Sequence, residues 1–198
     1  MNILVGDKYS ISGLNCGKAN LMMFTLVLVG LVFIFSYGFS NVAAASGDVI
    51  YVNDSSGNDS WNGLNSSYVD GINGPKATIG NAIGSVNNNG TVYIANGTYN
   101  ENNINTNMTI IGQSRDGTII NGTNTGTVFI VASGVDVTLS NLCIANGNNG
   151  NAGAGVFNNG NLTLLNSSFV DNNATYMMGG GHGGAIYNNY GNVTVEGL

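Results

Sequence analysis

The acidic residues of this sequence are candidates for catalysis, because carboxylates can act as acids, bases or nucleophiles. Asp116, Asp136 and Asp171 stand apart along the chain, and no paired Asp-Asp occurs. Glycoside hydrolysis generally uses two carboxylates that flank the scissile bond, and eliminative cleavage of acidic sugars uses a basic proton acceptor near acidic groups. No group of acidic residues is spaced along the sequence so that it would lie beside Arg115 on neighbouring strands. The sequence therefore predicts no catalytic residues and no enzymatic activity.

Oxygen-bearing side chains raise the question of a bound metal. Asp54 and Asp59 lie on either side of Asn58, and calcium binds carboxylate and amide oxygens. The chain is rich in glycine but lacks the Asp-containing nonapeptide repeat of calcium-binding β-helices. We therefore expect no metal site and no cofactor, with calcium at the Asp54 and Asp59 pair as the alternative.

Asparagine offers a third kind of chemistry, the attachment of glycans. The triplet Asn-x-Ser/Thr recurs along the chain because Asn and Thr are both abundant. Glycans are attached only to surface asparagines of an exported protein, and asparagines in turns are the most suitable ones. Asn96, Asn121 and Asn173 fall in predicted turns and are the candidate attachment sites.

An apolar segment near the N-terminus indicates export. Residues 21–35 read LMMFTLVLVGLVFIF, follow Lys8 and Lys18, and precede an Ala-x-Ala site before Ser46. These are the three parts of a signal peptide, and cleavage would leave Ser46 as the first residue. The alternative is an uncleaved anchor, since residues 21–39 approach the length that spans a bilayer. Both readings place the protein at the cell surface or outside the cell, and the membrane would be a partner only through residues 21–39.

Composition excludes several classes of protein. The chain has 31 Gly, one Pro and 7% charged residues, which does not suit a helical bundle. A net charge of −6 with two basic residues after position 45, Lys76 and Arg115, argues against binding to nucleic acid. Cys143 is the single cysteine after the apolar segment, so the mature part holds no internal disulfide. We expect an inert, packed or half-buried thiol, with an exposed reactive one as the alternative.

A repeated triplet of apolar, Thr and apolar residues predicts the elements that carry these side chains. The copies are Met108-Thr109-Ile110, Val137-Thr138-Leu139, Leu162-Thr163-Leu164 and Val193-Thr194-Val195. Their threonines lie 29, 25 and 31 residues apart, which indicates equal strands joined by unequal loops. Alternation along a strand places the apolar residues inward and the threonines in an outer column.

Two further columns complete a coil of three strands. Asn141–Ile144 resembles Asn166–Phe169, 25 residues later, and Phe129, Phe157 and Tyr187 form the third column. Such coils stabilise each other by stacking, because one coil cannot bury its edges alone.

Segments rich in Gly and Asn, at residues 146–155 and 172–184, are the predicted turns between these strands. If a partner is bound, we expect it at residues 173–184, which include His182. The favoured interpretation of this segment is a solvated spacer.

A helix is expected before the repeats. After Pro75, apolar residues stand at Ile79, Ala82, Ile83 and Val86, which is helical spacing, and Gly90 would end the helix. Laid across the first coil, the helix would cover apolar surface and a sheet edge. The predicted domains are therefore an export segment (residues 1–45), an N-terminal cap (46–90) and parallel β-helix repeats (91–198).

These residues resemble the pectin-lyase-like right-handed parallel β-helix proteins, especially adhesin-like surface proteins and polymorphic outer-membrane repeat proteins. The likeness begins with YVNDSSGNDSWNG at residues 51–63, GPKATIGNAI and TVYIANGTYNEN, and continues in GGAI at 183–186 and FVDN at 169–172. Gly153–Val156 is only a loose copy of GGAI. The resemblance implies an all-β solenoid that acts as a non-enzymatic adhesin or envelope component. A surface glycan or another surface protein would be its partner.

The same superfamily includes enzymes, so a polysaccharide-active lyase or glycosidase, or a remnant of one, is the alternative function. Gly181-His182-Gly183 resembles a triplet of polygalacturonases, but it lies in a glycine run without their acidic motifs. We interpret His182 as a loop residue. After Val193–Val195 the final coil is incomplete, as in a fragment or a short family member, and its open end predicts end-to-end self-association.

Overall fold

The computed structural model describes residues 47–100, 103–175 and 182–197. The predicted export segment and its cleavage site before Ser46 lie outside the described residues. Residues 176–181, part of the segment 173–184 where a partner would be expected, also lie outside them. Within the described part of the chain, no helix is long and apolar enough to cross a membrane.

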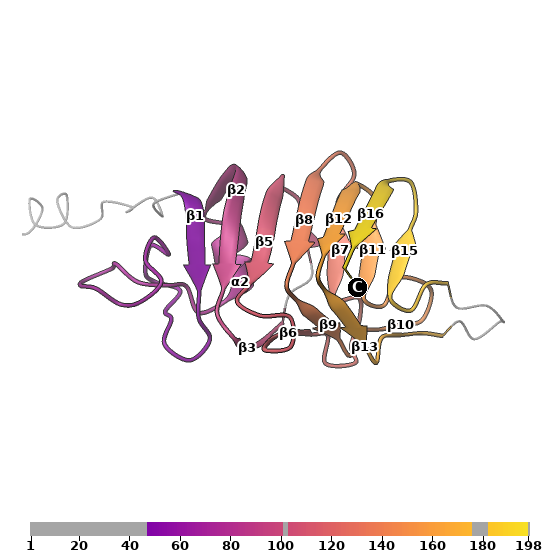
Figure 1. Ribbon diagram of the computed structural model, residues 1–198, viewed down its shortest axis with the longest axis horizontal. Coiled ribbons are helices and arrows are strands. Elements are labelled where there is room, and N and C mark those ends of the chain that lie inside the picture. The colour runs from indigo at the N-terminus through magenta and orange to yellow at the C-terminus, as the bar shows by residue number, and fades with distance from the viewer. Residues whose placement is uncertain (1–46, 101–102, 176–181, 198) are drawn as a thin grey trace, which may run out of the picture. The chain divides into compact units, whose positions relative to one another are not determined.

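Parallel strands in stacked sheets form nearly all of the regular structure, so the predicted all-β class is confirmed (Figure 1). The largest sheet has six strands, which are in spatial order β1 (Gly47–Val52), β2 (Val86–Ile94), β5 (Met108–Gly112), β8 (Asp136–Ser140), β12 (Asn161–Leu165) and β16 (Asn192–Glu196). A second sheet contains β4 (Asn103–Ile104), β7 (Phe129–Val131), β11 (Val156–Asn158) and β15 (Ile186–Asn188). The third contains β3 (Gly97–Tyr99), β6 (Thr118–Asn121), β9 (Cys143–Ala145) and β13 (Ser168–Val170).

The chain visits the three sheets in turn. After β8 it forms β9, then β11, and returns to the first sheet as β12, which pairs in parallel with β8. The next turn through β13 and β15 ends in β16, which pairs with β12. Each turn thus adds one strand to each sheet, a path that is compatible with a β-solenoid.

The repeated triplets lie in register, as the sequence predicts. Thr109 pairs with Thr138, Thr138 with Thr163, and Thr163 with Thr194. Their apolar neighbours point inward, and Ile110, Leu139 and Leu164 are fully buried in one continuous core. The structure adds Thr91 of β2, which pairs with Thr109. The triplet pattern does not include Thr91, because the pattern requires an apolar side chain before the threonine and Gly90 stands there.

The second predicted column is confirmed, and the third is wrong by one residue at Phe129 only. Cys143 pairs with Ser168 and Ile144 with Phe169, as expected. In the second sheet, however, Phe129 pairs with Val156, whereas Phe157 pairs with Ile130 and, as predicted, with Tyr187. Phe129 is fully buried, because a shift of one residue moves a side chain to the opposite face of a strand.

Asparagine forms the corner between the first and third sheets. Asn141 and Asn166 follow β8 and β12 with φ angles of 56° and 41°, a left-handed conformation that Asn tolerates better than most residues. The Asn166 Nδ2 donates to the Asn141 Oδ1 of the neighbouring coil at 2.8 Å. These turns keep equivalent strands aligned from coil to coil.

The predicted turn segments after β9 and β13 carry some pairing of their own. Each contains a two-residue strand, β10 (Asn148–Asn149) and β14 (Asn173–Ala174), and these two strands pair in parallel. The described parts of the loops therefore stack on each other as the main strands do.

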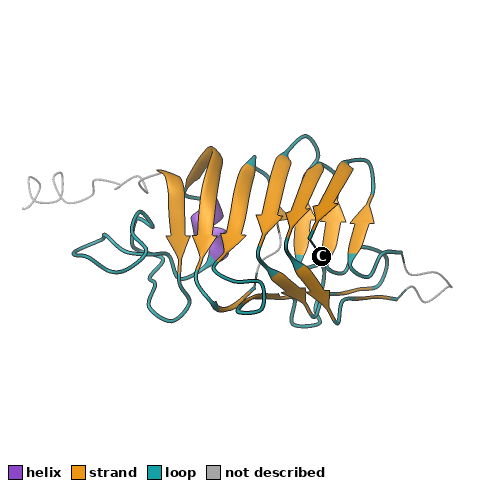
Figure 2. Ribbon diagram, viewed as in Figure 1, coloured by secondary structure: helices purple, strands orange, loops and turns teal. Residues whose placement is uncertain are grey.

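The N-terminal helix is shorter than predicted. Helix α2 (Ile79–Ile83) begins after the N-cap Thr78 and ends at Gly84, and Val86 already belongs to β2. The expected domain boundary after residue 90 therefore falls inside a continuous strand. Valine favours strands, and the run of Asn87, Asn88 and Asn89 is poorly suited to a helix. In Figure 2, α2 lies behind the six-stranded sheet, where it packs against β1 and β2.

A loop rather than this helix covers the free edge of β1. The Tyr51 N–H donates to the Gly63 carbonyl at 2.7 Å, and the Tyr51 carbonyl accepts from the Lys76 N–H at 2.8 Å. The segment between β1 and α2, residues 53–78, extends beyond β1 at this end of the stack (Figure 1). It satisfies backbone groups that would otherwise be open to pairing with another chain.

The other end of the stack is more exposed. Strands β13, β15 and β16 are the last members of their sheets among the described residues. Val195 is 42% exposed, whereas Leu164, at the equivalent inward position of β12, is fully buried. Among the described residues, the inward side chains of these last strands are therefore less completely buried than their equivalents one coil earlier.

Tyr99, a buried residue of β3 in the third sheet, connects that sheet to the first loop, residues 53–78. The Tyr99 hydroxyl donates to the Ala95 carbonyl at 3.0 Å and accepts from the Asp54 N–H at 3.2 Å. Burial raises the pKa of Tyr99 above its ordinary value. The hydrogen bond from the Asp54 backbone lowers this pKa in part, and the charge of Asp54 raises it.

We expect Leu164→Ala to lower the free energy of unfolding by about 2–5 kcal/mol, because it opens a cavity in the core. Thr163→Ala, a change at the adjacent outward position, should cost about 1 kcal/mol or less. Denaturant unfolding of the two variants measures both effects. Equal losses would contradict the assignment of inward and outward faces.

Tyr99 should make the fold sensitive to alkali. Because its pKa is higher in the folded state, the unfolded chain loses this proton first as pH rises. The stability that Tyr99 contributes is therefore complete below about pH 10 and decreases as the pH rises through that value. Tyr99→Phe should flatten the fall of unfolding free energy above pH 10. The matched variant Tyr190→Phe, at a residue 89% exposed, should leave that slope unchanged.

Candidate functional site

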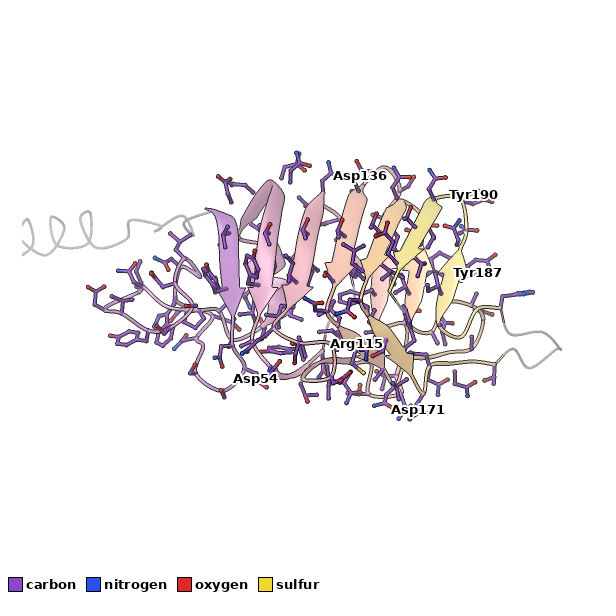
Figure 3. The ribbon with its side chains drawn as sticks, in the orientation of Figure 1. Asp54, Arg115, Asp136, Asp171, Tyr187 and Tyr190 are labelled. Atoms are coloured by element: carbon purple, nitrogen blue, oxygen red, sulfur yellow. The ribbon has the colours of Figure 1, made fainter. Side chains whose placement is uncertain are left out.

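The acidic residues singled out in the sequence do not form a cluster. Figure 3 shows Asp136 at one edge of the stack, Asp171 at the opposite edge and Asp54 towards the N-terminal end. Arg115 forms an ion pair with its neighbour Asp116, at 3.1 Å. Across the described ranges, no group of three or more His, Cys, Asp or Glu side chains could hold a metal ion.

The two carboxylates considered for calcium have structural partners. Asp59 Oδ1 accepts hydrogen bonds from the backbone N–H groups of Ala77 and Thr78, at 3.0 and 2.9 Å, and its Oδ2 accepts from the Thr78 hydroxyl at 3.1 Å. Asp54 Oδ2 accepts from the Thr98 N–H at 3.1 Å. Asp59 therefore anchors the start of α2, and Asp54 connects the first loop to β3.

The histidine and the cysteine lie in different surroundings. His182 is exposed, and its ring centroid lies 6.2 Å from that of Tyr187. Cys143 is a free, half-buried thiol on the outward side of β9, between Ile119 and Ser168 of the neighbouring strands. The half-buried environment agrees with the expectation of a packed thiol.

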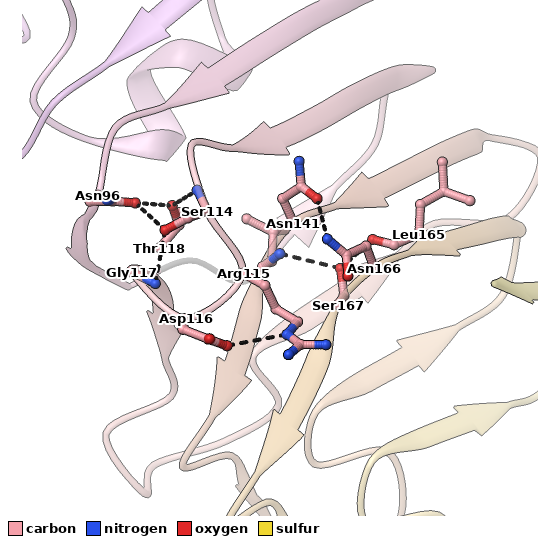
Figure 4. Close-up of polar contacts among 11 residues, drawn as sticks. Asn96, Ser114, Arg115, Asp116, Gly117, Thr118, Asn141, Leu165, Asn166 and Ser167 are labelled. Atoms are coloured by element: carbon pink, nitrogen blue, oxygen red, sulfur yellow. Dashed lines mark hydrogen bonds and ion pairs between the residues drawn. The ribbon is translucent and has the colours of Figure 1, made fainter. Parts of the chain in front are cut away.

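The three candidate glycan sites differ in their surroundings. Asn96 and Asn173 are exposed, whereas Asn121 is half-buried. The Asn96 Oδ1 accepts from the hydroxyls of Ser114 and Thr118 at 2.8 and 3.2 Å, as Figure 4 shows. The Asn121 Oδ1 accepts from the Thr123 N–H at 2.9 Å and from the Asn146 Nδ2 at 3.2 Å. Glycan attachment at these positions stays a prediction.

The outward face of the six-stranded sheet carries the most regular set of polar groups. Beside the threonine column runs a column of amide and carboxylate side chains connected by hydrogen bonds. The Asn161 Nδ2 donates to the Asp136 Oδ1 at 2.6 Å, and the Asn192 Nδ2 donates to the Asn161 Oδ1 at 2.9 Å. A groove of about 300 Å³ lies along these two columns, bordered by Thr109, Thr138 and Thr163. Equivalent groups thus repeat from strand to strand along one face.

A second hollow lies on the same face near the N-terminal end. It has a volume of about 380 Å³, and the side chains that line it include Tyr51, Asn53, Ser66, Tyr93 and Gln113. Tyr51 and Tyr93 are paired neighbours on β1 and β2, and their rings stack with centroids 5.8 Å apart and planes 20° from parallel. None of the lining residues is charged. We call this hollow the tyrosine pocket.

Sequence reasoning did not find the tyrosine pocket. The available signal was the similarity of Val-Ile-Tyr-Val at residues 49–52 to Thr-Val-Tyr-Ile at 91–94. Both segments alternate as strands do, and both place their tyrosine outward. The separation of about 40 residues hid their pairing, because it exceeds the spacing of the other repeats.

No family model, curated protein or solved structure matches the chain.

We expect Asp59→Ala to lower the free energy of unfolding by about 1–3 kcal/mol, because backbone donors at the start of α2 lose their acceptor. Asp116→Ala, which removes an exposed ion pair, should change it by less than about 1 kcal/mol. Millimolar calcium should leave the unfolding temperature of the unaltered chain unchanged. A rise with calcium that Asp59→Ala abolishes would instead support a calcium site.

Proposed function

We propose that this chain is an exported, adhesin-like surface protein of the pectin-lyase-like superfamily, built as a right-handed parallel β-helix. The right-handed path is the one that parallel crossover connections take in nearly all proteins. Export follows from the apolar residues 21–35 and the Ala-x-Ala site before Ser46. The protein would act by binding a surface glycan or another surface protein, not by catalysis.

The observation that carries this proposal is the outward face of the six-stranded sheet. Thr91, Thr109, Thr138, Thr163 and Thr194 repeat there in register on successive strands. Their neighbours at 107, 161 and 192 are amides, and the carboxylate of Asp136 already accepts a hydrogen bond from Asn161. Such a face offers many evenly spaced hydrogen-bonding groups with little net charge. It suits adhesion to an extended, hydroxyl-rich surface.

Rigidity supports the same role. The side chains beneath this face, such as Val137, Leu139 and Leu162, are buried in the continuous core. A partner that binds the outward groups would find them already positioned, which lowers the entropy lost on association. A fixed array of weak contacts can then reach useful affinity by acting together.

Host cells that export the full chain should adhere to surfaces coated with cell-envelope glycans, and host cells without the chain should not. Thr163→Lys should weaken this adhesion severalfold, because it places a charge and a long side chain in the threonine column. Ser168→Lys is the matched control, since Ser168 is a half-buried outward residue of the third sheet. Depolymerisation of polygalacturonate or a related glycan by the purified chain would overturn the proposal in favour of a polysaccharide-active enzyme.

A further inference from the structure

The tyrosine pocket has a chemistry of its own, separate from the threonine column. We propose that it is a binding site for an uncharged saccharide unit. The inference rests on the proposed function in one respect, because it names the class of glycan that the adhesive face would recognise.

The aromatic rings provide the first argument. Tyr93 is 41% exposed and Tyr51 is half-buried, so their stacked rings form an aromatic platform that is partly open to solvent. Ile111 of β5 follows Tyr93 in the same outward column and extends this apolar surface. The C–H face of a sugar ring packs well against such a platform, and the tyrosine hydroxyls can bond to the sugar hydroxyls.

The amides provide the second argument, because their oxygens already have partners. The Asn53 Oδ1 accepts from the N–H groups of Ser55 and Ser56 at 3.0 and 3.1 Å, and from the Ser55 hydroxyl at 2.9 Å. The Gln113 Oε1 accepts from the Asn96 N–H at 3.0 Å. Among the residues that the structure describes, the NH₂ groups of both amides have no acceptor, so they can donate to a ligand. Two fixed donors beside an aromatic platform match the acceptor hydroxyls of a sugar.

The charge of the pocket and of the whole chain favours an uncharged sugar over an acidic one. The side chains that line the pocket carry no charge, and the chain as a whole has a net charge of −6. A carboxylate or sulfate sugar would find no cation in this lining and would be repelled by the surrounding field. The hollow of about 380 Å³ lies within the usual range of small-molecule sites, and its wall includes Ser66 of the first loop.

The test uses the full chain in a detergent without sugar groups, with cellohexaose, mannohexaose and xylohexaose as neutral probes and trigalacturonate as the acidic probe. Titration calorimetry gives the affinities, and saturation-transfer NMR shows which sugar protons contact the protein. We expect at least one neutral hexaose to bind and trigalacturonate to bind more weakly or not at all. Tyr93→Ala should weaken the neutral binding about tenfold, from the loss of one aromatic contact face.

Two further variants make the result specific to the pocket. Tyr190→Ala removes an 89% exposed tyrosine outside the pocket and should leave the affinity unchanged. Gln113→Ala removes one donor while Tyr93 stays intact, and it should also weaken binding. This variant keeps the test valid if Tyr93→Ala does not fold. The inference is overturned if no neutral hexaose binds, if trigalacturonate binds best, or if both pocket variants bind as the unaltered chain does. Adhesion that persists in both pocket variants would overturn this inference alone, whereas turnover of a glycan would overturn the proposed function.

Discussion

In-register parallel pairing between successive coils is the constraint on which the whole structure depends. Most of the strands have three to five residues and too little surface to be stable by themselves, and their backbone groups find most of their partners in the coils before and after. The pairing of Thr109, Thr138, Thr163 and Thr194 shows that this register holds along the stack. The core follows from it, because each inward residue is covered by its equivalents in adjacent coils.

The same constraint produces the outward face. Once inward positions are aligned, alternation along each strand aligns the outward positions as well. Threonine suits these sites because its branched side chain fits a half-exposed strand, and its hydroxyl stays accessible. Amides at the ends of the strands bond to their equivalents one coil away, as Asn161 does with Asp136 and Asn192. One set of contacts thus stabilises the stack and displays a regular surface.

The segment that covers the edge of β1 also helps to form the tyrosine pocket. At β1, residues 53–78 cover the strand edge, and Ser66 of that segment borders the hollow over Tyr51 and Tyr93. The pocket therefore depends on a loop whose main structural task is to satisfy the edge of a sheet. At the opposite end, the inward Val195 is exposed among the described residues because β16 is the last strand of its sheet.

The sequence by itself determined the short parallel strands, their inward and outward residues in the threonine triplets, and the pairing of Cys143 with Ser168, because these depend on local alternation and on nearly equal spacing. It did not determine the register around Phe129, since adjacent apolar residues there suit either face, or the end of α2, where strand pairing takes Val86 out of the helical pattern. The meeting of Tyr51, Ser66, Tyr93 and Gln113 was decided only by the tertiary structure. Their separation along the chain is set by a loop without a repeat, and no local pattern records which outward side chains will become neighbours when the coils stack.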